Sequence, residues 1–370
     1  MALADKLAAI DCGLGYACQF CPQEDVCALD KPHHNRVLIE NRLAEIDQII
    51  LVLANKGGVG KSTVSANLAA GLAGRGFKVG VADADVHGPN QSRFFGFAGE
   101  HVRLGDSGLA TRDYADPAMA QPVKVGSLAF LLESDDTPVV WRDAYKHDFV
   151  HHLAGSFDWG PLDFLIVDMP PGTGNELITL CDMLEGANVS ALLVTTPQAV
   201  ALMDSMKAAR FCHERGLPIL GVVENMAGMV CPHCAGEIHI FPNADLESRL
   251  AEAAVETVAR VPLAIELASA SDDGAPLVIS APESAAAKAF APAVDACAAL
   301  GRADFDGAVA HALDDVFAEN LRADTLEEAL AELDPLAQAE MRDAVTSLLG
   351  EEAARLHDAA SAGEQKRGQS

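Results

Sequence analysis

Residues 49–63 read IILVLANKGGVGKST, and this stretch decides the fold. The apolar run Ile49–Leu53 predicts a buried strand, and the apolar spacing after Lys61 predicts a helix. A glycine-rich turn joins the two elements. Strand, glycine turn and helix make a P-loop, in which backbone N–H groups and the positive end of the helix dipole surround phosphate oxygens. The stretch therefore predicts a nucleotide-binding loop.

Each residue type of this loop has an expected task. Lys61 is expected to reach the β- and γ-phosphates, and Ser62 is expected to give its hydroxyl to Mg²⁺. Asn55 stands where the P-loop motif usually has its first glycine, and asparagine also tolerates left-handed backbone angles. The rest of the nucleotide cradle is assigned to Gly57, Gly58, Val59, Gly60 and Thr63.

Composition limits the classes of partner. The 370 residues carry a formal net charge of −28, which argues against binding nucleic acid or anionic lipid through charge. No apolar run approaches the length of a membrane span. The first residues, MALADKLAAIDCG, lack the layout of a signal peptide, so a cytoplasmic protein is expected.

Nine cysteines are many for such a chain, and six of them cluster in two groups. In a reducing compartment, clustered cysteines are more often metal ligands than disulfides. The first group is Cys12-x5-Cys18-x2-Cys21-x5-Cys27, and its four thiolates suit either zinc or an iron–sulfur cluster. The three remaining cysteines are expected to be small buried apolar residues.

The second group, Cys231 and Cys234, is a single C-x2-C in the stretch CPHC. Two thiolates are half of what a tetrahedral metal or a cubane cluster requires. Three completions stay open. His239 and another side chain complete a zinc site within one chain, the two thiols form a redox pair, or a twofold dimer supplies a second copy.

Acidic residues end two further predicted strands. Asp83 and Asp85 follow a strand over 77–82, and Asp168 ends a strand over 164–168. Ligands in open α/β sheets bind at the carboxyl ends of strands, and Asp168 is expected to hold Mg²⁺ through water. The loop over 169–174 has two prolines and two glycines, which suits a segment that senses the γ-phosphate.

Strand and helix patterns alternate through the central chain, which predicts an α/β fold with a mainly parallel sheet covered by helices on both faces. Further strands are expected over 123–132, 189–195 and 218–223. A helix is expected to follow the 189–195 strand and to end at about residue 214, and two more helices are expected over 246–258 and 284–300. We expect a cysteine-rich arm and lead-in helix over 1–46 and an ATPase domain over 47–300. A helical appendage with a disordered tail is expected over 301–370.

The motifs KGGVGKST, DADVHGPN, DMPPGTG, ENM and CPHC, in this order, resemble those of the Mrp-type iron–sulfur carrier ATPases. These carriers share a deviant Walker A loop with MinD, ParA and the nitrogenase iron protein. The resemblance covers about residues 47–300. It implies ATP as the nucleotide, a homodimer in which Lys56 crosses to the partner's phosphate, and a 4Fe–4S cluster bridged by Cys231 and Cys234.

The resemblance also implies roles for other residues. Asp85 would position the attacking water and Asp83 would support the metal site. Asn225 would hydrogen-bond the adenine, and the turn that contains Pro262 would line the base pocket. Asn175 stands where the family usually has an acid. The N-terminal arm is similar to the ferredoxin-like segment of eukaryotic cytosolic iron–sulfur scaffold ATPases, which implies a cluster there, although its first cysteine gap is shorter.

Together these features predict a slow ATPase that assembles a labile 4Fe–4S cluster and passes it to apoproteins. A MinD- or ParA-like switching ATPase with structural zinc explains the P-loop but neither cysteine cluster, and it would usually bring a basic or membrane-seeking surface. An ATP-driven reductase like the nitrogenase iron protein takes its paired cysteines from separated positions. These two remain the alternative hypotheses.

Overall fold

The computed structural model describes much of the chain up to Gly301. The chain divides into two compact units, Met1–Gly301 and Arg302–Ser370, and every described residue belongs to the first. The expected helical appendage and Cys12 therefore lie outside the described residues. The described residues are 15, 17, 18, 21, 23–85, 88–102, 108–131, 153–172, 174–231, 233–234, 236–238, 240–241, 246–253 and 255–301.

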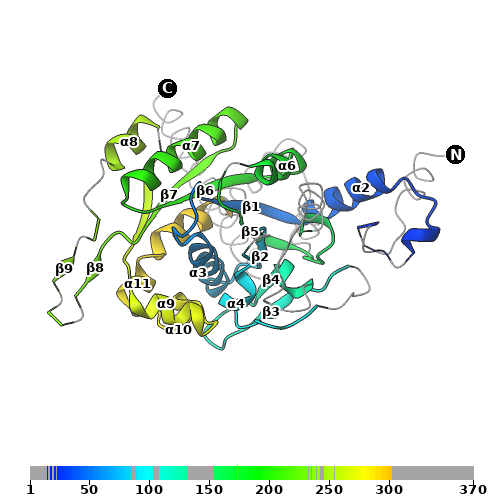
Figure 1. Cartoon of the computed structure of the whole chain (residues 1–370). Helices are drawn as coiled ribbons and strands as arrows, with labels where there is room; N and C mark the ends of the chain where they lie inside the picture. Colours follow the sequence, from blue (N-terminus) through cyan, green and yellow to red (C-terminus); the bar gives the residue numbers. More distant parts are fainter. Residues whose placement is uncertain are drawn as a thin grey trace, which may run out of the picture. The chain divides into compact units, whose positions relative to one another are not determined.

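An eight-stranded sheet runs through this unit (Figure 1) in the order β10-β7-β6-β1-β5-β2-β4-β3. All neighbouring strands are parallel except β3 and β4. The prediction of a mainly parallel α/β sheet is confirmed. The strands are β1 (Ile46–Leu53), β2 (Val79–Asp83), β3 (Arg112–Tyr114), β4 (Val123–Ser127), β5 (Leu162–Asp168), β6 (Val189–Thr195), β7 (Ile219–Asn225) and β10 (Thr257–Val261).

Helices cover both faces of the sheet, because successive side chains of a strand point to opposite faces and both sets are apolar here. Ile49 and Leu51 of β1 pack with one group of helices, and Ile50 and Val52 pack with the other. The first group is α2 (Lys31–Leu43), α6 (Asn175–Met183), α7 (Ala199–Arg215) and α8 (Leu246–Glu252). The second is α3 (Lys61–Gly74), α9 (Ile265–Asp272), α10 (Leu277–Ser280), α11 (Ala285–Lys288) and a helix over 291–301. Figure 1 shows α7 and α3 on opposite sides of the sheet.

The helix predicted over 246–258 is wrong in its second half. α8 ends at Glu252, and Thr257–Val261 forms the edge strand β10, parallel to β7. Ala259 and Val261 are buried whereas Arg260 between them is exposed. This alternation is the period of a half-buried strand, so the β pattern overrode the helical one.

The helix predicted over 284–300 is divided in two. Ser284 caps α11 by accepting a hydrogen bond from the N–H of Ala287 at 3.1 Å, but α11 ends at Lys288. The second helix begins at residue 291, with Pro292 in its first turn. Proline lacks an N–H and its ring clashes with the carbonyl four residues earlier, so a continuous helix was not available.

The strand predicted over 123–132 is shorter than expected. β4 ends at Ser127, and the chain continues as the 3-10 helix η3 (Leu128–Leu131). The segment before it contains β3, which pairs antiparallel with β4 at the edge of the sheet. Among the helices of the described residues, none combines the length and apolar character that crossing a membrane requires.

Candidate functional site

The candidate site lies where three adjacent strands end. In the register of the sheet, Asp83 at the end of β2 lies beside Asp168 at the end of β5, and Asp168 lies beside Val52 of β1. The glycine loop follows β1 directly and leads into α3. The parallel topology therefore brings together the loop and both acids, although Asp168 follows Lys61 by more than a hundred residues in the sequence.

Two glycines shape the loop. Gly58 and Gly60 have φ angles of +78° and +86°, which side-chain-bearing residues rarely adopt. Gly60 caps α3, and a Cβ on it would collide with the side-chain amide of Asn225. Val59 between them is buried, and its carbonyl accepts a hydrogen bond from Asn225 Nδ2 at 2.8 Å. The hydrogen bond from Asn225, the last residue of β7, thus fixes the position of the loop.

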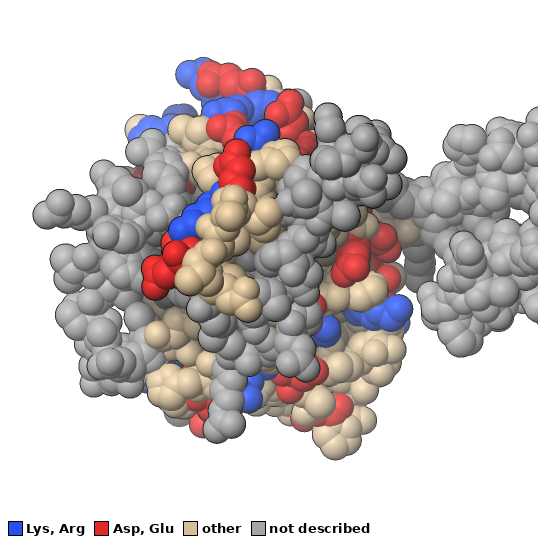
Figure 2. All heavy atoms as spheres, turned by 90° about the vertical axis from the view of Figure 1, so that its right-hand side faces the viewer, with Lys and Arg blue, Asp and Glu red and all other residues tan. Residues whose placement is uncertain are grey.

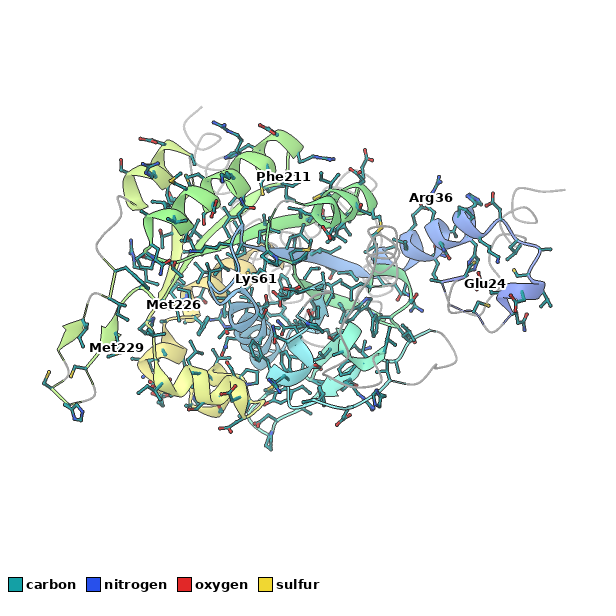
Figure 3. The ribbon with its side chains drawn as sticks, in the orientation of Figure 1. Glu24, Arg36, Lys61, Phe211, Met226 and Met229 are labelled. Carbon is teal, nitrogen blue, oxygen red and sulfur yellow. The ribbon has the colours of Figure 1, made fainter. Side chains whose placement is uncertain are left out.

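Lys61, the first residue of α3 (Figure 3), is nearly fully buried. Its Nζ lies 3.0 Å from Oδ1 of Asp168, which is fully buried, and Ser65 Oγ donates to the same oxygen at 3.2 Å. A buried carboxylate requires a paired charge and hydrogen bonds of this kind. Lys61 and Asp168 therefore form one unit at the helix start, where phosphate would bind.

Gln91, which the sequence analysis did not single out, is the hub of the site. It opens α4 (Gln91–Phe94) and is fully buried. Its Nε2 donates to the Ser62 carbonyl at 3.0 Å and to Asp168 Oδ2 at 2.9 Å, and its backbone N–H donates to Asp83 Oδ2 at 2.9 Å. Gln91 belongs to none of the motifs recognised in the sequence, so its bridging hydrogen bonds become evident only from the fold.

Replacing Gln91 by leucine is expected to lower the free energy of unfolding by about 1–3 kcal/mol, because Asp168 Oδ2 and the Ser62 carbonyl lose a buried donor. Urea unfolding without nucleotide measures this change. Asn90→Ala is the matched control, since Asn90 is exposed and its side-chain amide donates to the nearby carbonyl of Gly88. Equal stability of the two variants would show that the bridge contributes nothing.

The two acids after β2 are differently placed. Asp83 is fully buried, and besides Gln91 it accepts a hydrogen bond from Ser127 Oγ at 3.0 Å. Burial, and then the carboxylate of Asp168, raise the pKa of Asp83 to about 8. Asp85 is half-buried, and its Oδ1 accepts from the N–H of Gly88 at 3.3 Å. Asp85 is thus the acid with access to solvent.

The raised pKa of Asp83 predicts a pH-dependent stability. The unfolded chain releases this proton near the ordinary value of 3.8, whereas the folded chain keeps it until about pH 8. Asp83 therefore destabilises the metal-free fold progressively as the pH rises between these values. Urea unfolding in EDTA should show the stability of Asp83→Asn gaining on the wild type from pH 5 to pH 8. A difference independent of pH would contradict a buried, protonated Asp83.

The oxygen donors at this edge fit Mg²⁺, which prefers oxygen ligands. Ser62, Asp83 and Asp168 are joined through Gln91, and Gln91 Oε1 is buried without a hydrogen-bond partner among the described residues. Such an orphaned acceptor suits a water of a hydrated cation. Bound Mg²⁺ would neutralise charge on the nucleotide phosphates.

Lys56, the second lysine of the loop, is not part of this buried network. Its Nζ donates to Gln198 Oε1 at 3.4 Å, and both side chains are half-buried. Gln198 is the residue that precedes α7. The two lysines of the loop therefore differ: Lys61 is fixed inside the chain, whereas Lys56 lies at the surface beside a helix start.

The two residues predicted for the base pocket, Asn225 and Pro262, lie at the ends of neighbouring strands, and their contact with adenine stays a prediction. Asn225 ends β7, and its register partner in β10 is Val261, the residue before Pro262. The amide of Asn225 donates to the P-loop in this structure. Met226 follows with a φ of +56°, rare for a residue with a side chain. Figure 3 shows Met226 between the sheet and a short hairpin that begins at Met229.

The loop after β5 is bonded to the phosphate loop. The N–H of Gly172 donates to the Ala54 carbonyl at 2.9 Å, and Gly172 has a φ of +104°. This contact joins the predicted γ-phosphate sensor to the start of the nucleotide loop. Thr173 and the side chain of Asn175 lie outside the described residues.

Cys231 and Cys234 lie at the tip of a hairpin formed by β8 (Met229–Val230) and β9 (Glu237–Ile238). Figure 1 shows this hairpin projecting from the β7 side of the sheet. The N–H of Cys231 donates to Gly236 at 2.8 Å and closes the turn. Backbone N–H groups of His233 and Cys234 lower the pKa of the Cys231 thiol, which favours the thiolate that metals bind.

The described N-terminal cysteines do not meet at a common metal position. Cys18 is buried and Cys21 and Cys27 are half-buried. Among the residues that the structure describes, no three or more histidine, cysteine, aspartate or glutamate side chains stand close enough to hold a metal ion. Cys12 and His239 are not among those residues, so the four-cysteine site and a zinc site through His239 stay predictions.

Comparison with protein families agrees with this geometry. The family model ParA, described as the NUBPL iron-transfer P-loop NTPase, matches residues 45–298. This range contains the nucleotide loop, all the acids of the site and the CPHC hairpin, and it leaves out the N-terminal cysteines.

Three relatives show how far the similarity extends. The iron-sulfur cluster carrier protein of Methanocaldococcus jannaschii is 36% identical over 71% of this chain and 89% of that protein. That of Aquifex aeolicus is 41% identical over 66% of this chain and 65% of that protein. The structure of a nucleotide-binding protein from Archaeoglobus fulgidus in complex with ADP matches with a TM-score of 0.55 and 31% identity. It covers 65% of this chain and 92% of that one.

Proposed function

Since this chain belongs to the ParA family of iron-transfer P-loop NTPases and is thereby an ATPase, we propose that it is an ATP-dependent iron–sulfur cluster carrier. Two copies would bind a 4Fe–4S cluster between them and pass it to apoproteins. The observation that carries this proposal is the CPHC hairpin, which presents two thiols at the surface with one already favoured as thiolate. Relatives named as cluster carriers support it.

The need for a second copy follows from the number of ligands. A cubane cluster takes four thiolates, and one hairpin supplies Cys231 and Cys234. A twofold axis through the hairpin tips would complete the set with identical residues of the partner. Lys56 at the surface agrees with a residue that reaches the partner's nucleotide. The same dimer would then join both sites.

Nucleotide and cluster are connected through the end of β7. Asn225 holds the Val59 carbonyl of the phosphate loop, and the hairpin begins at Met229, a few residues later. Met226 lies between them in a left-handed conformation. If ATP draws Asn225 toward the adenine, the bond to Val59 is released and the hairpin moves with it. Nucleotide state would thereby change cluster binding.

For hydrolysis we assign one task to each residue of the site. Lys61 would hold the β- and γ-phosphates, with the glycine loop donating its backbone N–H groups. Ser62 and Asp168 would hold Mg²⁺, supported by Asp83. Asp85, the solvent-accessible acid, would orient the attacking water. A slow turnover suits a switch that must persist until a recipient is met.

Anaerobic cluster transfer tests the proposal. The full chain, reconstituted with iron and sulfide, is mixed with an apoenzyme that is active only with a 4Fe–4S cluster, with and without Mg-ATP. We expect activity of the recipient to return, at a rate that depends on nucleotide. Reduction of a recipient's existing cluster without transfer would favour a reductase instead, and zinc without labile sulfide would favour a zinc-stabilised switch.

A further inference from the structure

The N-terminal arm contains a buried thiol and imidazole that the ATPase does not use. We propose that Cys18, Cys21, Cys27 and His34 form a site for a single tetrahedral metal ion of the zinc type. The fourth ligand would then be His34, on α2, and Cys12 would be dispensable. This site is separate from the proposed carrier function, because none of its residues belongs to the P-loop or the hairpin.

The spacing of the buried pair fits one metal ion. Cys18 Sγ lies 3.3 Å from His34 Nδ1. Zinc bonds of about 2.3 Å to sulfur and 2.0–2.1 Å to nitrogen, at the tetrahedral angle, place two such ligands about 3.5 Å apart. The ligands of a cubane cluster each bind a different iron, so they stand farther apart. The pair is hydrogen-bonded at a separation close to that of two ligands of one ion and too short for two ligands of a cubane cluster.

The pair is also fixed in position before any metal binds. The N–H of Cys18 donates to Asn35 Oδ1 at 2.8 Å, which ties the cysteine to the second turn of α2. The N–H of His34 donates to the carbonyl of Asp30, the residue that caps this helix, at 2.9 Å. Cys18 and His34 are only 6% and 3% exposed. Two ligands are thus preorganised, which lowers the entropic cost of metal binding.

Cys21 and Cys27 are placed to complete the set. Both line one small cavity together with Cys18 and His34. The N–H of Cys21 donates to the Cys18 carbonyl at 3.1 Å, which forms the tight turn of a C-x2-C ligand pair. The two thiols do not yet converge on the buried pair. Both are half-buried, and metal binding would draw their side chains toward the buried pair.

In the described part of the arm, two surface features add little to its stability. Val26, a large apolar side chain of the arm, is 82% exposed. The ion pair of Lys31 with Glu24 at 3.2 Å is substantially exposed and so adds little stability. Figure 2, which views the α2 side, shows acidic and basic side chains interleaved there. Small segments without a core commonly depend on a metal or disulfides, and a metal site would supply this.

Titration with Co²⁺ under anaerobic conditions tests the ligand set, because tetrahedral Co²⁺ has visible d–d bands and sulfur-to-cobalt charge transfer. The full chain with Cys231→Ser/Cys234→Ser removes the hairpin thiols. In this background Cys12→Ala is expected to keep the Co²⁺ spectrum and affinity, whereas His34→Ala should weaken binding by at least about 100-fold. His33→Ala, the neighbouring histidine, is the matched control and should bind normally.

His34→Cys guards against a folding artefact. Because it restores a fourth ligand, it should recover Co²⁺ binding with stronger charge transfer than the wild-type set. Three results would overturn the proposal: binding lost in Cys12→Ala but kept in His34→Ala, no recovery in His34→Cys, or no tetrahedral Co²⁺ in the starting background. The carrier proposal rests on the hairpin thiols and is untouched by any of these results.

Discussion

Replacing Lys61 by alanine is expected to lower ATP hydrolysis at least about 100-fold, because the phosphates lose the cation at the start of α3. The substitution also strands the fully buried carboxylate of Asp168 without its partner 3.0 Å away. Breaking a buried pair from one side costs about 3–5 kcal/mol of folding free energy. Phosphate release measures the first effect and urea unfolding measures the second. Nucleotide titration shows how far the loss of the cation also weakens nucleotide binding.

Lys56→Ala is the informative comparison, because both lysines lie in the same loop. Lys56 contacts Gln198 near the surface and leaves the buried pair untouched. We expect this variant to unfold like the wild type and to bind nucleotide within about threefold, while hydrolysis that requires the dimer falls. If Lys61→Ala binds nucleotide as well as Lys56→Ala, the assignment of Lys61 to the phosphates is wrong.

Removing both hairpin thiols, in Cys231→Ser/Cys234→Ser, is expected to abolish the bridging cluster. A serine hydroxyl is a harder and weaker ligand than a thiolate, and iron–sulfur clusters favour soft thiolate ligands. Labile sulfide and transfer to an apoenzyme should disappear. Nucleotide binding should stay within about twofold, because neither cysteine contributes to the phosphate loop. Metal and sulfide analysis after anaerobic reconstitution measures the loss.

His233→Ala is the control for the double variant. The side chain of His233 is exposed in the same turn, and its backbone N–H, which lowers the pKa of Cys231, is kept. It should retain sulfide and transfer. Transfer that survives in the double variant would place the transferable cluster elsewhere in the chain.

Much of the site could be predicted from the sequence because its chemistry is local. The glycine loop, Asp83 and Asp168 each follow an apolar run, and the topology of a parallel sheet brings strand ends together. The prediction of a mainly parallel sheet with helices on both faces came from the alternation of strand and helix patterns along the chain. These inferences need only the period of the apolar residues and the position of the polar ones.

The parts that were missed depend on contacts between distant residues. Gln91 matters because its amide lies between Ser62 and Asp168, and no spacing in the sequence reveals this. His34 reads as one histidine among twelve until the fold places it against Cys18. The helix predicted over 246–258 failed because pairing with β7 decided the structure of its second half.

Native mass spectrometry of the anaerobically reconstituted full chain tests the central claim most directly. If the chain is a carrier with a bridging cluster, the dimer should hold one 4Fe–4S cluster, in addition to any metal ion bound by the arm. This cluster should be absent when Cys231 and Cys234 are replaced. Because the cluster requires two hairpins, disrupting it should also weaken the dimer when nucleotide is absent. A cluster-free chain, or one hairpin cluster retained by each isolated monomer, would contradict the account.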